Sequence, residues 1–397
     1  MREMGFMEKL LDGVEVEWTA INEVLNMRAG QHISASNIND YPDDEYQYPC
    51  FGGNGVRGFV KYNSHDGKYL LIGRQGALCG NVQRTDGKFY ATEHAVVVSS
   101  KRAINLDWAF HLLTMMNLNQ YASKSAQPGL AVGKIQSLKI PIPCPKNPKK
   151  SLEIQAEIVR ILDAMTAHTA ELTAELTARK KQYDYYRDKL LSFEDDVYEF
   201  PLSDICTSIA DGDHQAPPQT STGINFVTIS NISKNGFIDF SKTKYVPDDY
   251  YKNLASKRKP RFGDVLYTVV GSIGIPVFID FEKEFTFQRH VAILRFKTEL
   301  VNPKYVFHFM RSRIFFNKAN SVAMGAAQKT ITLGTLGKLK ISLPSLERQN
   351  NIVAILDKFD SLANSITDGL PREIELRQKQ YAYYRDLLLS FPAAQAA

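Results

Sequence analysis

The chain has 397 residues, 44% of them hydrophobic and 23% charged, with a formal net charge of +5. This length suits two domains with separate cores, and the composition excludes a disordered chain. The positive charge favours an acidic partner only weakly, because an ordinary basic enzyme can carry as much.

The four cysteines are scattered and include no C-x-x-C pair. We therefore expect reduced thiols and no metal site built on them. The N-terminus lacks the continuous apolar stretch of a secretory signal, and no apolar run reaches about 18 residues. We expect a cytoplasmic protein that does not enter a membrane.

In the first half of the chain, short runs rich in Val, Ile, Tyr and Phe are separated by turn signals such as Asp66-Gly67 and Asp86-Gly87. This pattern is typical of hairpins. Gly53-Asn54-Gly55-Val56-Arg57-Gly58 fits the G-x-G-x-x-G pattern, but a strand-like run follows it where a dinucleotide site requires a helix. We interpret it as a glycine-rich turn. In a DNA-binding protein such a loop could bring its backbone close to a phosphate, so Asn54 and Arg57 are candidate contact residues.

Two further motifs keep an enzymatic alternative open. Pro42-Asp43 with Asp66-Gly67-Lys68 fits a metal-dependent nuclease pattern, although Asp-Gly is a strong hairpin-turn signal. Asn302-Pro303-Lys304-Tyr305 resembles part of an adenine methyltransferase signature, but a helix cap explains it better. A stand-alone endonuclease or methyltransferase is therefore the alternative to a binding protein.

Leu152 to Phe193 carries apolar residues at heptad spacing and predicts one continuous helix. Its 42 residues would span roughly 63 Å. The helix contains a tandem repeat, Thr169-Ala170-Glu171-Leu172 and Thr173-Ala174-Glu175-Leu176. Each unit adds about 6 Å, so the repeat could set a spacing. It could also be ordinary helix-forming sequence.

The second half repeats the alternation of short strands and turns, at Asn235-Gly236 and Gly263-Asp264, and predicts a helix over Lys304 to Phe316 capped by Asn302. The apolar stripe of the central helix returns from Ile352 to Phe391. Gly369-Leu370-Pro371 interrupts it, and proline there predicts a kink or break.

Several segments of the first half recur in the second. Ile158–Asp163 returns as Ile352–Asp357 after 194 residues (352 minus 158), and Tyr183–Asp188 as Tyr381–Asp386 after 198 (381 minus 183). Offsets of 196, 197 and 201 relate three further pairs: His94–Val98 with His290–Leu294, Phe110-His111 with Phe307-His308, and Leu138–Pro143 with Leu339–Pro344. The duplication predicts two mixed domains, mostly strands, of one shared fold. A pseudo-twofold molecule of this kind suits a nearly twofold target such as duplex DNA.

The helix ends Q-Y-x-Y-Y-R-D-x-L-L-S-F, the T-A-E-L repeats and the opening Met7–Trp18 resemble the DNA specificity subunit of type I restriction-modification systems. Among them, the chain looks closest to the subfamily with T-A-E-L spacer repeats. The resemblance implies a pseudo-twofold α+β fold with two homologous target-recognition domains, residues 1–148 and 194–344. An antiparallel coiled coil of two repeated helices, residues 149–193 and 345–397, would separate them.

The resemblance also implies a function in phage defence. Each domain would recognise one half of a bipartite, asymmetric site on double-stranded DNA, with the unread spacer set by the helices. The helices would dock two modification subunits, which methylate adenine with S-adenosylmethionine, and restriction subunits would use ATP and Mg. The chain itself would be non-catalytic and hold no cofactor. A scaffold that binds only proteins is a further alternative.

Base recognition needs side chains with hydrogen-bond donors or acceptors at the groove edges. Candidates in the first half are Gln31, His32, Arg74, Gln75, Lys124 and Gln127. Candidates in the second half are His214, Gln215, Ser230, Asn231, Arg289, Gln328 and Lys329. Lys257, Arg258 and Lys259 suit phosphates, unless they form a solvated loop.

His94 and His290 occupy matching positions beside apolar strands, where a structural histidine is the commoner outcome. Their neighbours differ, Ala91-Thr92-Glu93 in one half and Phe287-Gln288-Arg289 in the other, as expected for two unlike half-sites. The tyrosine-rich helix ends are predicted to form a partner-binding surface. These tyrosines are Tyr183, Tyr185, Tyr186, Tyr381, Tyr383 and Tyr384.

Overall fold

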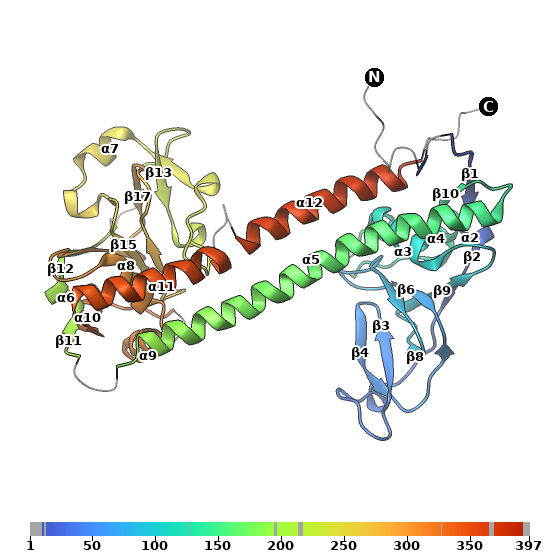
Figure 1. Ribbon diagram of the computed structural model, residues 1–397, viewed down its shortest axis with the longest axis horizontal. Coiled ribbons are helices and arrows are strands. Elements are labelled where there is room, and N and C mark those ends of the chain that lie inside the picture. Colours follow the sequence, from blue (N-terminus) through green and yellow to red (C-terminus); the bar gives the residue numbers. More distant parts are fainter. Residues whose placement is uncertain are drawn as a thin grey trace. The chain divides into compact units, whose positions relative to one another are not determined.

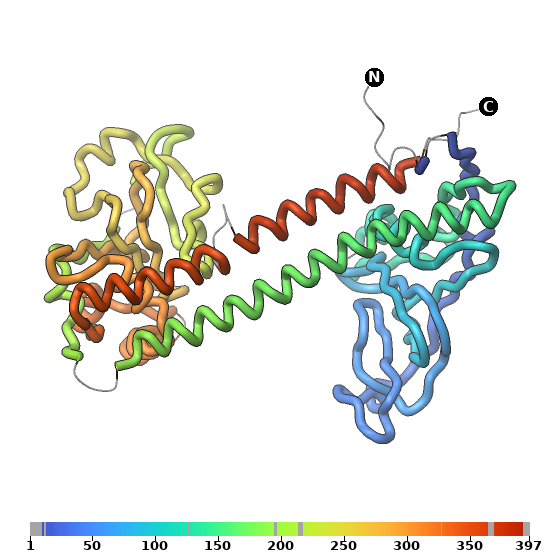
Figure 2. The backbone as a smooth tube through the Cα atoms, in the orientation of Figure 1, coloured from blue at the N-terminus to red at the C-terminus, as the bar shows by residue number. Residues whose placement is uncertain are grey.

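The computed structural model describes residues 10–11, 13–125, 127–193, 197–212, 217–326, 328–364 and 369–391. The chain divides into two compact units: unit 1 is Met1–Glu171 with Glu375–Ala397, and unit 2 is Leu172–Ile374. The tube in Figure 2 follows the chain through α5 (Pro148–Leu190) into unit 2 and back through α11 (Leu346–Asn364) and α12 (Leu370–Leu389). Each unit therefore contains part of α5 and part of α12.

Unit 1 contains two four-stranded sheets and a two-stranded pair (Figure 1). The first sheet is antiparallel, in the order β2 (Leu25–Ala29), β9 (Ala95–Ser100), β6 (Tyr69–Gly73), β7 (Val82–Thr85). The second has the order β4 (Gly55–Val60), β3 (Tyr48–Gly52), β8 (Lys88–Ala91), β5 (His65–Asp66), with β3 and β8 parallel. The antiparallel pair is β1 (Val16–Ala20) with β10 (Lys139–Pro143).

Unit 2 repeats this topology except that, among the described residues, no strand of its smaller sheet corresponds to β5. Its antiparallel sheet has the order β12 (Cys206–Asp211), β18 (Val291–Phe296), β15 (Val265–Thr268), β16 (Pro276–Phe278). The smaller sheet is β14 (Lys244–Val246), β13 (Ile224–Val227), β17 (Phe285–Phe287), again with one parallel pair. The remaining pair is β11 (Glu199–Pro201) with β19 (Lys340–Ser342). The predicted α+β class and the shared fold of the two halves are confirmed.

In each unit, one helix begins directly after an asparagine whose side chain caps it. Asn105 accepts from the backbone of α3 (Leu106–Met115), and Asn302 does the same for α8 (Pro303–Met310). The single helix predicted over Lys304 to Phe316 is wrong, because Ser312 caps a second helix, α9 (Arg313–Val322). The other short helices are α2 (Ile21–Val24), α4 (Val132–Gln136), α6 (Leu202–Ile205), α7 (Asp248–Asn253) and α10 (Leu333–Lys338). Single 3-10 turns span Ala35–Asn37, Leu118–Tyr121, Ile229–Asn231, Phe240–Lys242 and Ser256–Arg258.

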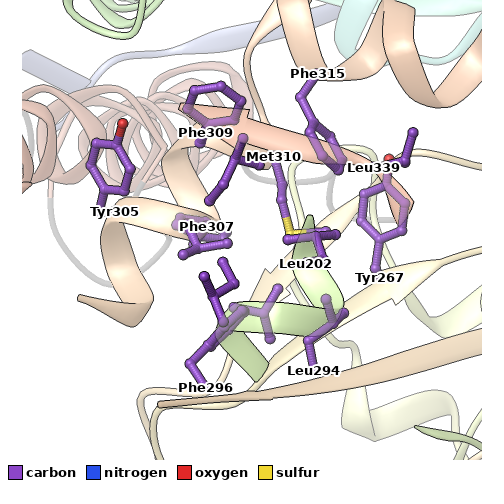
Figure 3. Packing of buried hydrophobic residues seen from close by; sticks show 14 of the residues in the cluster. Leu202, Tyr267, Leu294, Phe296, Tyr305, Phe307, Phe309, Met310, Phe315 and Leu339 are labelled. Atoms are coloured by element: carbon purple, nitrogen blue, oxygen red, sulfur yellow. The ribbon is translucent and has the colours of Figure 1, made fainter. Parts of the chain in front are cut away.

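The main core of unit 2 lies between its antiparallel sheet and its helices, with Tyr305 and Phe309 of α8 and Phe315 of α9 among its largest members (Figure 3). Alternate residues of β15 serve different cores. Val265 and Tyr267 belong to this cluster, whereas Leu266 belongs to the one between the two sheets. A strand buried on both faces is apolar throughout, which explains its continuous hydrophobic run.

The long helices pack against each other in opposite chain directions within each unit. In unit 1 the early part of α5, with Ile158 and Leu162, shares a core with Leu388 near the end of α12. In unit 2 the late part of α5, with Tyr183, shares a core with Ile352 and Leu356 in the first half and middle of α11. Two members of the predicted heptad stripes, Tyr186 of α5 and Phe359 of α11, stack on each other in unit 2 with ring centroids 5.4 Å apart. None of the helices in the described ranges has both the length and the apolar character needed to cross a membrane.

The C-terminal helical region is divided, as Gly369-Leu370-Pro371 predicted. α11 ends at Asn364 and α12 begins at Leu370, with Pro371 in its first turn. Gly369 has a φ of 82°, and a side chain there would lie 2.6 Å from the carbonyl oxygen of Ser361. Glycine is therefore required by both conformation and space.

Candidate nucleic-acid interface

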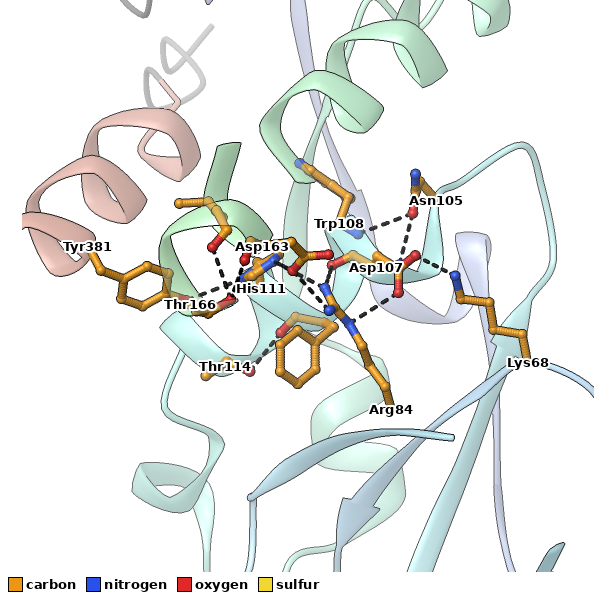
Figure 4. A network of polar contacts seen from close by, with 12 residues as sticks. Lys68, Arg84, Asn105, Asp107, Trp108, His111, Thr114, Asp163, Thr166 and Tyr381 are labelled. Atoms are coloured by element: carbon orange, nitrogen blue, oxygen red, sulfur yellow. Dashed lines mark hydrogen bonds and ion pairs between the residues drawn. The ribbon is translucent and has the colours of Figure 1, made fainter. Parts of the chain in front are cut away.

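A buried histidine joins three elements in unit 1 (Figure 4). His111 of α3 is fully buried, with Nε2 2.8 Å from Oδ1 of Asp163 on α5 and Nδ1 3.3 Å from the hydroxyl of Tyr381 on α12. Burial lowers the pKa of His111 below its ordinary 6.5, so the ring is neutral near pH 7. Nε2–H then donates to Asp163, and Nδ1 accepts from Tyr381.

Unit 2 contains the same arrangement. His308 of α8 is fully buried, with Nε2 2.8 Å from Oδ1 of Asp357 on α11 and Nδ1 3.1 Å from the hydroxyl of Tyr183 on α5. Burial lowers the pKa of His308 and raises the pKa of Tyr183 to about 12. The tyrosine hydroxyl therefore keeps its proton and donates it. We call each of these Asp–His–Tyr sets a node.

A second polar contact fixes each domain on its own helix. Oε1 of the buried Gln155 on α5 accepts from the backbone N–H of Asn105, at 2.8 Å. Oε1 of the buried Gln349 on α11 accepts from the backbone N–H of Asn302, also at 2.8 Å. Both contacts lie at the start of the capped helix that carries the node histidine, so the long helices set the orientation of that helix in each unit.

The candidate residues of unit 1 gather on one set of loops. Backbone bonds from Arg74 to the carbonyl of His94 (2.8 Å) and from Gly76 to that of Pro128 (3.0 Å) join the loop after β6 to two others. A side chain on Gly53, in the β3–β4 turn, would lie 3.0 Å from the carbonyl oxygen of Gln75. The Asn54 turn, the Arg74-Gln75 loop and the loop with Lys124 and Gln127 are therefore neighbours.

Gln31 and His32 complete this group. Gly30 lies against the backbone of Ala91, and Nδ1 of His32 is 3.1 Å from Oε1 of Glu93. Sequence reasoning did not include Glu93, although its alignment with Arg289 was visible. We call the set the unit 1 edge: Gln31, His32, Asn54, Arg57, Arg74, Gln75, Glu93, Lys124 and Gln127. Its side chains are exposed, except that Arg74 and Glu93 are half-buried.

The backbone frame of this edge recurs in unit 2. Val269 bonds to the carbonyl of His290 (2.9 Å) and Gly271 to that of Lys329 (2.8 Å). Gln328 Nε2 lies 3.7 Å from the position of a side chain on Gly271. We call the corresponding set the unit 2 edge: Ser230, Arg258, Arg289, Gln328 and Lys329. Arg258 forms an ion pair with Asp211 at 3.7 Å, and a side chain on the next residue, Gly212, would lie 2.8 Å from the backbone nitrogen of Arg289.

The unit 2 edge does not include five other candidates of the second half, which are His214, Gln215, Asn231, Lys257 and Lys259. His214 and Gln215 lie outside the described residues. Lys257 is exposed beside Arg258, whereas Lys259 is half-buried and donates to the carbonyl of Lys252 on α7 at 2.9 Å.

Asn231 is 6% exposed, and its side chain caps a 3-10 turn and also bonds to the backbone of Lys242. Oδ1 accepts from the N–H (2.9 Å) and the hydroxyl (2.8 Å) of Thr228, and Nδ2 donates to the carbonyl of Lys242 (3.1 Å). These bonds leave Asn231 a structural role, so we leave it out of the proposed base contacts. The Thr228-x-x-Asn231 spacing was the available signal.

The motifs behind the enzymatic alternative have structural roles. Oδ1 of Asp43 accepts from the N–H groups of Glu45 (2.9 Å) and Tyr46 (2.7 Å), and these bonds hold the pKa of Asp43 below its ordinary 3.8. Lys68 pairs with Asp107 of α3. Across the described ranges, no group of three or more His, Cys, Asp or Glu is arranged to hold a metal ion. The glycine-rich motif is a hairpin turn followed by a strand, as predicted. All four cysteines are free.

The six helix-end tyrosines divide into two groups. Tyr183 is 2% exposed and Tyr381 is half-buried, because both belong to the nodes. Tyr185 and Tyr383 are 60% and 64% exposed, and each forms an edge-to-face pair with the next residue, Tyr186 or Tyr384. Only the second group offers an aromatic surface.

Comparison with known proteins assigns the class. Residues 14–179 and 194–376 match the family model described as the type I restriction modification DNA specificity domain. Because these segments cover most of the chain, the chain belongs to this family.

Two full-length relatives support this assignment. A putative type I restriction enzyme specificity subunit of Haemophilus influenzae is 34% identical over 410 residues, covering 97% of this chain and 98% of the relative. The EcoR124I/EcoR124II specificity subunit of Escherichia coli is 34% identical over 439 residues, covering 99% and 98%. The EcoprrI specificity subunit of E. coli is 62% identical over 162 residues, which is 41% of this chain and 39% of that relative.

Solved structures share the fold. The crystal structure of the type I S subunit from M. genitalium matches with a TM-score of 0.62 at 14% identity, over 96% of this chain and 98% of that one. The chain is a specificity subunit that recognises DNA within a type I restriction-modification complex, and it is non-catalytic. The stand-alone nuclease, the stand-alone methyltransferase and the protein-only scaffold are set aside.

Proposed function

We propose that the chain recognises a bipartite, asymmetric DNA site, one half with residues 1–148 and the other with residues 194–344. The helical segments 149–193 and 345–397 would set the spacer between the halves. One observation carries this proposal: the two edges share a backbone frame but differ in side chains. Arg74 and Gln75 occupy the places that Val269 and Val270 occupy in unit 2, as the matched backbone bonds show. A shared frame with unlike donors and acceptors suits two unlike half-sites.

The contact residues have different chemical roles in this proposal. Amide and guanidinium groups pair with base edges, so Gln31, Arg74, Gln75, Gln127, Arg289 and Gln328 are the proposed base contacts. Single charges and hydroxyls suit phosphates, so Lys124, Ser230, Lys257, Arg258 and Lys329 are the proposed phosphate contacts. Asn54 and Arg57, on an exposed turn, would approach the phosphates as well. His32 would act beside Glu93.

We further propose that two modification subunits dock on the tyrosine pairs of the helix ends, one at Tyr185 and Tyr186 and one at Tyr383 and the half-buried Tyr384. The tyrosine pair occurs once in each unit, and exposed aromatic pairs are enriched in protein interfaces. The modification subunits would bind S-adenosylmethionine, and restriction subunits would bind ATP and Mg. The T-A-E-L repeats support membership of the subfamily that carries them, acting in the cytoplasm in phage defence.

The test is to produce the chain with its modification subunits and to map methylated adenines genome-wide. We expect one motif made of two unlike halves separated by unread bases. A single contiguous motif would contradict the two-domain assignment. The chain alone, with Mg or S-adenosylmethionine, should neither cleave nor methylate DNA.

A further inference from the structure

In each unit a tight turn connects the smaller or mixed sheet to the antiparallel sheet, and this turn has the same geometry in both units. Ala95 bonds to the carbonyl of Thr92 at 3.0 Å in the turn from β8 to β9, and Val291 bonds to that of Gln288 at 3.0 Å in the turn from β17 to β18. The second residue of the turn is Glu93 in unit 1, after Thr92, and Arg289 in unit 2, after Gln288. The same place on two matched edges therefore carries opposite charges.

Histidine is retained at the next position of both turns. The carbonyls of His94 and His290 accept from Arg74 and Val269, at 2.8 and 2.9 Å, so the backbone at this point is fixed to the neighbouring loop. The two turns thus have the same backbone bonds and the same following histidine. Glu93 and Arg289 therefore differ only in the chemistry of their side chains. Glu93 can only accept hydrogen bonds when ionised, whereas Arg289 can only donate them.

Glu93 has acceptor capacity to spare. Its Oε1 is 3.1 Å from Nδ1 of His32 and 3.4 Å from Nε2 of His94. Its Oε2 is buried, and no described residue donates a hydrogen bond to it. The side chain of Glu93 is 33% exposed, and His32, the partner of Oε1, is 76% exposed and can turn away. A donor on a ligand could then take its place at Oε1 without moving the backbone.

A carboxylate on this edge is repelled by phosphates, because the edge faces a polyanion. It becomes favourable only where it meets a donor, and base amino groups are the donors that the major groove presents. Arg289 has the complementary property. Its side chain is exposed, and no described residue accepts from its guanidinium. A bidentate donor of this kind fits O6 and N7 of guanine.

We propose that this turn position determines base specificity in both domains, with opposite polarity. Glu93 accepts from the amino group of a cytosine in one half-site, and Arg289 donates to a guanine in the other. The inference rests on the proposed function, because it assumes that each edge meets one half-site. It adds which base chemistry each edge selects at one position.

The test uses Glu93→Gln and Arg289→Gln in the full complex, with methylated adenines mapped for each variant. Glu93→Gln should relax one base position in one half-site, because an amide can accept and donate. Arg289→Gln should relax one position in the other half-site. Discrimination at the affected position should fall about 5- to 140-fold. In each variant, an unchanged half-site for the unaltered unit in the methylation map shows that the variant is folded and assembled.

Matched controls remove the same charge elsewhere on each unit. Glu23→Gln on α2 and Lys338→Gln on α10 alter exposed side chains and should leave both half-sites unchanged. The inference is overturned if the half-sites of both turn variants match those of the wild type. A uniform loss of methylation in Arg289→Gln, with an unchanged motif and a smaller salt dependence, would mean a phosphate contact instead. If the wild-type map shows no bipartite motif, the proposed function fails; if it does and the variants match it, only this inference fails.

Discussion

At the residue scale, the neutral state of His111 and His308 decides how the nodes work. A neutral ring has one donor and one acceptor, and each node supplies an aspartate for the first and a tyrosine hydroxyl for the second. In unit 2, Lys304 donates to the second oxygen of Asp357 at 2.7 Å, so the carboxylate is also satisfied. A node with all partners present orients its three elements; a node lacking one leaves a buried polar atom unpaired.

Removing one hydroxyl tests this directly. Tyr183→Phe keeps the packing of the ring but leaves Nδ1 of His308 without a donor. We expect the free energy of unfolding to fall by about 1–3 kcal/mol, the usual cost of an unsatisfied buried group. Denaturant titration of the complex measures it. Tyr185→Phe, on a side chain that is 60% exposed, should change it by less than about 0.5 kcal/mol. Equal effects of the two variants would contradict the role of the node.

The same histidines make stability depend on pH. Because burial lowers the pKa of His308 in the folded chain below the ordinary 6.5, the unfolded chain binds a proton that the folded chain does not. Stability is therefore complete above about pH 6.5 and falls as the pH decreases below it. Hydrogen bonds from His308 and Lys304 outweigh burial and keep the pKa of Asp357 below 3.8, so its titration contributes only at lower pH.

We predict that the thermal midpoint of the complex decreases between about pH 7.5 and about pH 5.5, and that His308→Gln reduces this slope. Glutamine can still donate to Asp357 and accept from Tyr183, but it does not titrate. The exposed His168 of α5 is the control: His168→Gln should keep the wild-type slope. An unchanged slope in His308→Gln would rule out this histidine as the titrating group.

The sequence predicted part of this chemistry and not the rest. Repetition aligned His111 with His308 and Asp163 with Asp357, because both pairs lie inside repeated blocks at nearly equal offsets. It did not predict that Tyr183 and Tyr381 are node members, since helical periodicity gives the face of a residue but not its neighbour across the interface. Asn231 illustrates a related limit: an amide that caps a turn and an amide that meets a base have the same side chain, so the sequence does not distinguish them.

At the element scale, α5 is one helix of 43 residues, whereas its C-terminal counterpart is divided into α11 and α12. Glycine and proline predicted the division because their conformational limits are local. The boundary between α8 and α9 was missed, although Ser312 is a good N-cap, because the apolar pattern continues across it. Glycine and proline therefore predicted the break between α11 and α12. The capping serine did not predict the break between α8 and α9, because the apolar periodicity indicated one continuous helix.

The repeat inside α5 gives the prediction at this scale. Deleting Thr173–Leu176 removes about 6 Å and turns the remaining helix by about 40°. We expect a shorter spacer between the half-sites, with both base sequences unchanged, when methylated adenines are mapped for the deletion. Thr177→Ala, which keeps the helix length, should keep the spacer. A deletion that retained the original spacer would show that this helix does not set it.

At the scale of the whole molecule, the two compact units do not coincide with the first and second halves of the chain. The boundaries fall inside helices, between Glu171 and Leu172 and between Ile374 and Glu375. Unit 1 is completed by the C-terminal stretch, which adds Tyr381, Leu388 and Phe391 to a core built largely from the first half. The fold of each half could be predicted from its own residues; the completion of one half by the end of the chain could not, because it depends on contacts between distant segments.

We propose that each half-site is recognised by one domain on a frame that the long helices hold. The most direct test of this proposal replaces residues 1–148 with the corresponding residues of the H. influenzae relative, which matches this chain along nearly its whole length. Methylated adenines are then mapped with the modification subunits present. We predict that one half of the motif changes while the other half and the spacer length remain. A map in which both halves change together, or in which neither changes although the complex assembles, would contradict the account.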